Sequence, residues 1–157
     1  MTREEKFLSE ADLTDLKGMR ENKGGPFGCV IVKNDRIIAR GCNSVTATND
    51  PTAHAEIVAI REACRELSQF QLTGCEIYTS TEPCPMCMGA VYWARPARLY
   101  FGTTRQDAAE EGFDDSLIYT ELTLPFAQRR IPMKQIDLKS AKHLFEEWKN
   151  LTNRKEY

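Results

Sequence analysis

Histidine is scarce in this chain, long hydrophobic runs are missing, and neither sign of charge predominates. The 157 residues include only two histidines, so each one stands out as a candidate ligand or proton carrier. Apolar runs such as FGCVIV are too short to cross a bilayer and no signal-peptide pattern opens the sequence, which predicts a cytoplasmic protein without a membrane partner. The net charge of −2 and the pI of about 5.8 give no overall attraction to polyanions, so nucleic acid is not the expected partner.

Length and composition predict a single domain. The chain is 41% hydrophobic and 28% charged, which is ordinary for a globular protein, and its length is enough for one core but not for two. Charge varies locally: residues 106–121 hold six acidic residues and no Lys or Arg, whereas residues 128–157 hold eight basic residues against four acidic ones. Residues 123–132, which include Pro125 and Pro132, are predicted to be a hinge before the C-terminal segment 133–157.

Cysteine usage separates into two classes. Without a secretory signal, six cysteines are typical of reduced thiols rather than of a disulfide framework. Four of them stand singly in apolar stretches and are expected to be small buried hydrophobic residues: Cys29, Cys42, Cys64 and Cys75. Cys84 and Cys87 are the remaining pair, and their spacing calls for a different explanation.

Hydrophobic spacing and turn residues predict an α/β fold. The expected elements are a helix over 2–19, hairpin strands 26–32 and 36–41 joined at Asn34-Asp35, a helix from Pro51 to about residue 67 with Asp50 as its N-cap, a strand over 75–80, a helix over 85–94, a strand over 97–102, a short helix after Asp115, a last strand over 131–138, and a final helix capped by Ser140. This order predicts one mixed sheet of five strands with helices on both faces, the later strands running parallel through right-handed crossovers.

A His and a Glu stand together in the sequence His54-Ala55-Glu56, which predicts chemistry only in combination with the cysteines. Cys84 and Cys87 are three residues apart at the start of a predicted helix, a spacing that places both sulfurs on one side of its first turn. In a reduced protein such a pair is typical of a metal site or a redox site, and zinc in particular takes mixed sulfur and nitrogen ligands.

Three protein ligands, His54, Cys84 and Cys87, indicate a catalytic zinc rather than a structural one. A closed structural site takes four protein ligands, whereas a catalytic zinc leaves one position to water, whose pKa it lowers to about 7. His143, in the final helix, is expected to be a surface residue. Glu56 is the candidate proton carrier for that water, although a carboxylate in the first turn could also serve the helix dipole alone.

The sequence H-x-E followed by P-C-x-x-C resembles the zinc nucleobase deaminases, whose signature this is. His54 to Glu56 and Pro83 to Cys87 match it at each fixed position, and GGPFG, NDPTAHAE, EPCPMCMGAVYWARP, AAEEGFDDSLIY and the tail RKEY are similar to the short bacterial guanine deaminases. The resemblance covers nearly the whole chain. It implies a cytidine-deaminase-like three-layer α/β/α sandwich, and one zinc per subunit with a bound water or hydroxide.

The resemblance also implies a reaction and roles for further residues. Zinc hydroxide would attack C2 of guanine, Glu56 would shuttle protons, and ammonia would leave to give xanthine. The implied substrate contacts are Asn43 to the purine ring, Asp115 to the amino group as a proton relay, Phe27 by stacking, Trp93 in the pocket lining, and Tyr157 as a lid. In that family the C-terminal segment crosses to a partner subunit of a homodimer.

Each of these residues also has a purely structural explanation. Asn43 could simply end a strand, Asp115 could cap a helix, Phe27 and Trp93 could pack in the core, and Tyr157 could belong to a frayed end. Other functions also remain open on the sequence. They are a tRNA adenosine deaminase, which the basic C-terminal residues favour and the acidic 106–121 segment disfavours, a cytosine, cytidine or guanosine deaminase, and a zinc-stabilised module without catalysis.

Overall fold

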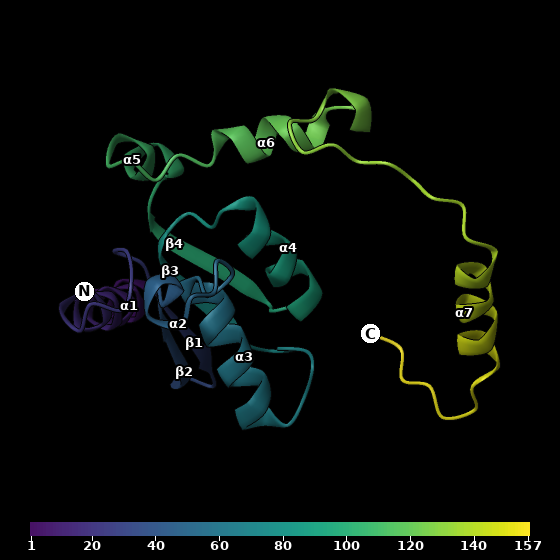
Figure 1. The fold of residues 1–157 in the computed structure, drawn as a ribbon. Coiled ribbons are helices and arrows are strands. Elements are labelled where there is room, and N and C mark those ends of the chain that lie inside the picture. The colour runs from purple at the N-terminus through teal and green to yellow at the C-terminus, as the bar shows by residue number, and fades with distance from the viewer. The chain divides into compact units, whose positions relative to one another are not determined.

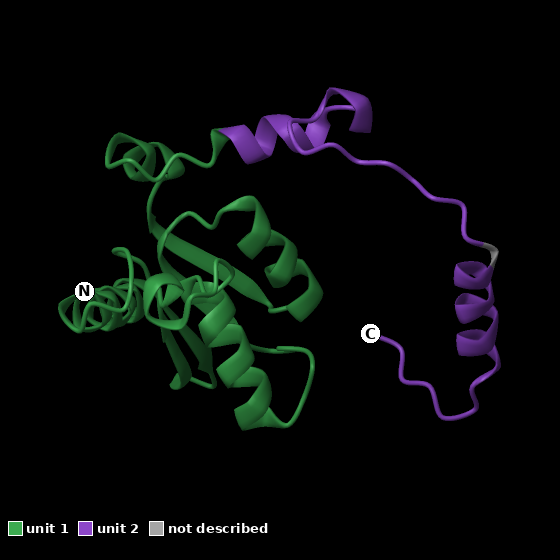
Figure 2. Ribbon diagram, viewed as in Figure 1, with its two compact units in different colours: residues 1–116 green, residues 117–157 purple. Residues whose placement is uncertain are grey.

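The computed structural model describes residues 1–157, apart from the side chain of Lys139. The chain forms two compact units, Met1–Ser116 and Leu117–Tyr157, which Figure 2 colours green and purple. The first unit holds the sheet and every residue predicted to bind the metal or the substrate except Tyr157.

The first unit alternates helices and strands along the sequence (Figure 1). Its elements are α1 (Arg3–Arg20), β1 (Gly28–Lys33), β2 (Arg36–Cys42), α2 (Val45–Thr48), α3 (Ala55–Leu67), β3 (Glu76–Thr81), α4 (Pro85–Ala94), β4 (Arg98–Thr103) and α5 (Arg105–Glu110). The strands form one mixed sheet in the order β2-β1-β3-β4, in which β1 is antiparallel to both of its neighbours and β3 is parallel to β4.

Helices cover both faces of this sheet, which gives three layers. Along β1, Cys29 and Ile31 face one core cluster, which also holds residues of α3 and α4, whereas Val30 and Val32 face a second cluster with residues of α1. Successive side chains of a strand point to opposite faces, so the continuous apolar run of β1 can be buried on both sides. The prediction of an α/β sandwich with a mixed sheet is confirmed.

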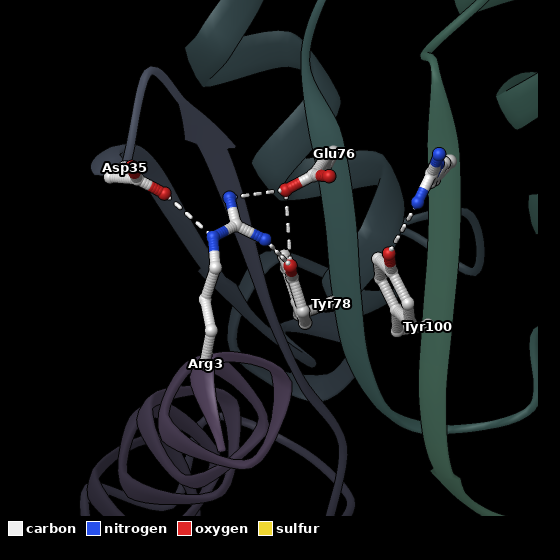
Figure 3. Close-up of polar contacts among 6 residues, drawn as sticks. Arg3, Asp35, Glu76, Tyr78 and Tyr100 are labelled. Carbon is white, nitrogen blue, oxygen red and sulfur yellow. Dashed lines mark hydrogen bonds and ion pairs between the residues drawn. The ribbon is translucent and has the colours of Figure 1, made fainter.

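A polar network fixes the start of α1 to the sheet. The Arg3 guanidinium donates to Asp35 in the hairpin turn and to Glu76 at the start of β3, with N···O distances of 2.6 Å in both cases. Figure 3 shows the same guanidinium beside the Tyr78 hydroxyl, at 2.7 Å. Three acceptors, two from β3 and one from the hairpin turn, therefore hold one helix.

Two local predictions differ from the structure. The tight hairpin is confirmed, with Asn34 and Asp35 at positive φ, but the helix predicted from Pro51, which is α3, begins at Ala55. Asp50 does not cap that helix because its side chain accepts from the Thr52 N–H and hydroxyl in a local turn, at 2.8 and 2.7 Å. The helix α5 was not predicted, although its Thr104 and Asp107 form a capping box.

The second unit is helical. It contains most of α6 (Ser116–Thr123), a short 3₁₀ turn (Phe126–Gln128) and α7 (Lys139–Asn150). α6 confirms the short helix predicted after Asp115, and α7 begins one residue before its predicted cap, Ser140. None of the helices in the described residues combines the length and hydrophobicity that a membrane span requires.

The predicted fifth strand is not found in the structure. Residues 131–138 form neither helix nor strand, and the sheet has four strands in the part of the chain that the structure describes. A strand requires a hydrogen-bonded neighbour, and the second unit offers none among its described residues. The spacing of apolar residues therefore does not suffice to form a strand there.

Candidate metal centre

The predicted metal ligands lie at the N-termini of two helices of the first unit. His54 is the N-cap of α3 and Cys84 is the N-cap of α4, both with extended backbone, and Cys87 lies in the first turn of α4. Pro85 at the first position of α4 suits that position because it lacks an N–H group. The positive ends of both helices therefore point toward the ligands and favour thiolate there.

The three donor atoms have the separation that zinc requires. His54 Nδ1 lies 3.6 Å from Cys84 Sγ and 3.6 Å from Cys87 Sγ, and all three atoms lie within 4.8 Å of one another. With Zn–S bonds of about 2.3 Å and Zn–N bonds of about 2.0 Å, a tetrahedral ion holds nitrogen and sulfur ligands about 3.5 Å apart. The residues fit a zinc ion, and they supply three of its four ligands.

The electrostatics of this cluster favour a charged sulfur. The pKa of Cys84 is lowered to about 4, first because Cys87 hydrogen-bonds to its sulfur and then because His54 does. The pKa of Cys87 is raised by the same bond and by burial, and the pKa of His54 is raised by its hydrogen bond with Cys84. The lowered pKa of Cys84 favours the thiolate, which is the protonation state in which a cysteine binds zinc.

Glu56 is a buried carboxylate next to the cluster. Its side chain is 6% exposed and its Oε2 accepts from Cys87 Sγ at 3.4 Å. Burial raises the pKa of Glu56, which favours the protonated form. Gly41 makes this position available, because a Cβ on Gly41 would lie 2.2 Å from the Ala55 carbonyl oxygen and would push α3 away from β2. A carboxyl group of raised pKa beside a metal cluster is suited to general acid–base work.

Asn43 is buried directly after β2 and is held by backbone groups. Its N–H donates to the Phe27 carbonyl at 2.9 Å and its Oδ1 accepts from the Val45 N–H at 3.2 Å. Only 8% of the residue is exposed. The side-chain amide is therefore fixed in orientation before any ligand is bound.

Phe27 and Asp115 are linked to the site through a residue that the sequence did not single out. Phe113 packs edge-to-face on Phe27 with ring centroids 4.9 Å apart, and it stands two residues before Asp115. The pKa of Asp115 is raised, first by burial and then by the negative charge of Cys84. The loop after α5 thus brings Asp115 within electrostatic range of the metal ligands.

Two of the residues predicted to form the pocket are exposed. Trp93 lies six residues beyond Cys87 on α4, about 240° further around the helix, and it is 64% exposed. Tyr157 is the last residue of the second unit and is 71% exposed. The roles of both in a pocket remain predictions.

Sequence analysis missed Phe113 and Gly24. Phe113 stands within the stretch that resembles a known family, but nothing in the sequence pairs it with Phe27. Gly24 is the first residue of the motif GGPFG, and the second glycine beside it was a signal of close backbone approach. A Cβ on Gly24 would lie 2.1 Å from Asn43 Oδ1.

Known proteins resemble this chain in sequence and fold. Residues 1–103 match the family described as the cytidine and deoxycytidylate deaminase zinc-binding region. The guanine deaminase of Bacillus subtilis is 52% identical over 98% of this chain and 98% of its own. A tRNA-specific adenosine deaminase of Aquifex aeolicus is 37% identical over 95% of this chain and 96% of its own length.

Solved structures of guanine deaminases are also similar to this chain. The X-ray structure of the Bacillus subtilis guanine deaminase superposes with a TM-score of 0.95 and covers 98% of both chains at 52% identity. A guanine deaminase structure from Nitrosomonas europaea has a TM-score of 0.66 at 31% identity, and the match covers 69% of this chain and 63% of that one.

Proposed function

Because this chain belongs to the cytidine and deoxycytidylate deaminase zinc-binding family, we propose that it is a zinc-dependent guanine deaminase. The reaction adds water at C2 of guanine and expels the amino group, giving xanthine and ammonia. The observation that supports a hydrolytic deamination best is the position of Glu56, a buried carboxyl group of raised pKa 3.4 Å from Cys87 Sγ in a His-Cys-Cys cluster. The choice of guanine is supported by 52% identity to a guanine deaminase along nearly the whole chain.

His54, Cys84 and Cys87 would hold one zinc ion per subunit. When bound there, zinc lowers the pKa of water to about 7 and so supplies the nucleophile at neutral pH. Glu56 accepts a proton from the attacking water and returns it to the departing amino nitrogen. Burial of Glu56 suits both steps, because a raised pKa helps one carboxyl group both to accept and to donate a proton.

Three residues of the first unit would hold the base. Asn43 hydrogen-bonds to the purine ring, Phe27 stacks on it, and Asp115 contacts the amino group and relays a proton. The burial of Asn43 and the charge coupling between Asp115 and Cys84 support these roles. A pocket that pairs each polar edge of the base rejects bases lacking those groups, because its own polar groups would stay unsatisfied.

The second unit would complete the site in a homodimer. We propose that residues 123–132 are a hinge, that residues 133–157 are exchanged with a partner subunit, and that Tyr157 closes the partner's pocket, which Trp93 lines. The exposed apolar side chains of α7 support this proposal, since Leu144, Phe145 and Trp148 require a covering surface. Deleting Tyr157 is then expected to reduce guanine turnover while zinc content stays unchanged. Equal kinetics of the shortened and full-length proteins would remove Tyr157 from the active site.

The substrate is tested by measuring ammonia release from guanine, guanosine, cytosine and a tRNA in separate reactions. We expect rapid release from guanine alone, in line with a cytoplasmic enzyme of purine catabolism. The tRNA arm is informative because the 37% identical relative is a tRNA-specific adenosine deaminase and residues 128–157 are basic. Faster ammonia release from tRNA than from guanine would mean that the substrate is adenosine in RNA. A protein that binds zinc but releases ammonia from none of these compounds would overturn the enzymatic function.

A further inference from the structure

Gly24 lies against the side-chain amide of Asn43. A Cβ added to Gly24 would stand 2.1 Å from Asn43 Oδ1 and 2.7 Å from the Asn43 carbonyl oxygen, both far inside van der Waals contact. The φ angle of Gly24 is outside the left-handed region, so its backbone conformation is open to other residues. Glycine is needed here for space and not for flexibility.

The residue before Gly24 is held in place by hydrogen bonds at both its carbonyl and its N–H. The Lys23 carbonyl accepts from the Ala47 N–H at 3.1 Å and from the Thr46 hydroxyl at 3.0 Å. The Lys23 N–H in turn donates to the Gly18 carbonyl at the end of α1, also at 3.1 Å. Because this segment is tied to α1 and to α2, a side chain at position 24 would displace Asn43 at least as readily as the segment itself.

The partners of Asn43 also determine which end of its amide can meet a ligand. A backbone N–H can only donate, so the amide atom that faces the Val45 N–H, at 3.2 Å, must be the oxygen. That oxygen is enclosed between Gly24 and Val45. The Nδ2 group, with two donors, is the end left for the substrate.

We propose that Gly24 is a positioning residue, which together with the Val45 N–H fixes the Asn43 amide so that it presents donors to the substrate. The substrate must then bring an acceptor, a carbonyl oxygen or an unprotonated ring nitrogen, to that point. This inference rests on the proposed function, because it takes Asn43 as a residue that binds the base. It explains why the Asn43 amide has this orientation, and it states which substrate groups that amide can bind.

The test measures guanine binding by calorimetry in a Glu56→Gln background, where turnover does not interfere. Gly24→Ala is expected to weaken guanine binding about 10- to 100-fold, the effect of leaving a buried polar group without its partner. Zinc content and the kcat of the otherwise unmodified enzyme should change far less than KM. Gly89→Ala is the matched control, since a Cβ on Gly89 meets nothing within 4 Å, and it should bind guanine as the parent does. Parent-like binding by Gly24→Ala would overturn the proposal.

Two further measurements decide the case if Gly24→Ala fails to fold or if guanine does not bind. Asn43→Asp keeps the oxygen that faces Val45 but replaces the donor group, so it should fold, retain zinc and lose guanine affinity as fully as Asn43→Ala. Full affinity in Asn43→Asp would show that the amide polarity is wrong. Without any base, the NMR resonances of the Asn43 side-chain amide should shift in Gly24→Ala and not in Gly89→Ala. Unchanged resonances would overturn the positioning role, whereas a parent protein that ignores guanine overturns only the proposed function.

Discussion

The two ends of the sheet in the first unit both carry ionisable side chains, but they compensate charge in opposite ways. At the hairpin end, the Arg3 guanidinium faces two carboxylates at 2.6 Å, and the Tyr78 hydroxyl bonds to both Arg3 and Glu76 (Figure 3). At the other end, Glu56 is buried beside Cys87 and takes part in no ion pair among the described residues. The first end is complete without a ligand and the second is not.

This difference separates structural from functional use of charge. A network in which each donor meets an acceptor holds elements together and needs nothing further. Burying Glu56, a carboxyl group of raised pKa, costs stability, and the neighbouring Cys84 is a thiol whose pKa is lowered. Groups with shifted pKa values are found where a protein performs chemistry. The comparison therefore assigns stability to the hairpin end and catalysis to the metal end, and it can be tested one residue at a time.

The largest expected effect is on the metal end. Glu56→Gln removes the proton carrier but keeps its size and burial, so guanine turnover should fall by at least about 10²- to 10⁴-fold. Zinc content, measured by elemental analysis, and thermal stability should remain close to those of the unmodified protein, because Glu56 is not one of the three donors.

Glu62→Gln is the control for this substitution. Glu62 is on the same helix, α3, but its carboxylate is exposed and pairs with Arg65. It should leave turnover unchanged. Retained ammonia release in Glu56→Gln would contradict the role of Glu56 and leave the contrast between the two ends without a catalytic basis.

The metal end could be predicted from the sequence because its ligands have fixed local spacing. Cys84 and Cys87 are three residues apart on one helix, and His54 and Glu56 are two residues apart at the start of another, so only one long-range contact had to be inferred. Asn43 and Gly24 could not be paired in this way. Their contact depends on where a loop after α1 meets the end of β2, and nothing local in the sequence reports that distance.

The fold was predictable to the same extent and for the same reason. Strands buried on both faces, and a helix that begins at a proline, carry local signals, which identified β1, β3 and α4. The predicted start of α3 was wrong because the Asp50 side chain forms a local turn instead of capping the helix. The fifth strand, over 131–138, was predicted from hydrophobic spacing, whereas strand formation depends on a partner that no local pattern encodes.

The hairpin end should respond in stability and not in chemistry. Tyr78→Phe keeps the fully buried ring but removes the hydroxyl shared by Arg3 and Glu76, and we expect the free energy of unfolding to fall by about 2 kcal/mol. The hydroxyl is protonated at all working pH values, since burial and Glu76 raise the pKa of Tyr78 to about 12. Guanine turnover should be unchanged.

Tyr100→Phe is the matched control at this end of the sheet. Tyr100 stacks on Tyr78 with ring centroids 4.7 Å apart, but its hydroxyl accepts only one long bond, from Arg98 at 3.5 Å. Denaturant unfolding with excess zinc should show little change for Tyr100→Phe. If both substitutions cost the same, the shared hydroxyl has no special part in holding α1.

The smallest effect concerns Asp15, a carboxylate that belongs neither to the hairpin end nor to the metal end. Asp15 is on α1 beside Gly28, on the face of the sheet away from α3, and its Oδ1 is the buried side-chain oxygen without a hydrogen-bond partner among the described residues. Burial, followed by the charge of Asp12, raises the pKa of Asp15 to about 6. If incomplete pairing always marked function, Asp15→Asn would impair turnover. We expect instead that it leaves turnover intact and stabilises the protein.

The sign of the pH dependence follows from the raised pKa. The unfolded Asp15 titrates near 4 and the folded one near 6, so the folded state holds the proton more tightly, and stability is lost as pH rises through 6. Asp15→Asn should therefore be more stable than the parent by about 1 kcal/mol at pH 7, a value reduced because the carboxylate is partly solvated. The difference should vanish near pH 4. Asp12→Asn removes the like charge from Asp15 together with a carboxylate whose own pKa is raised by burial, and it should give a smaller gain because the larger shift is that of Asp15. Unfolding curves for Asp15→Asn and the parent that coincide at both pH values would mean that this carboxylate has a partner in solution.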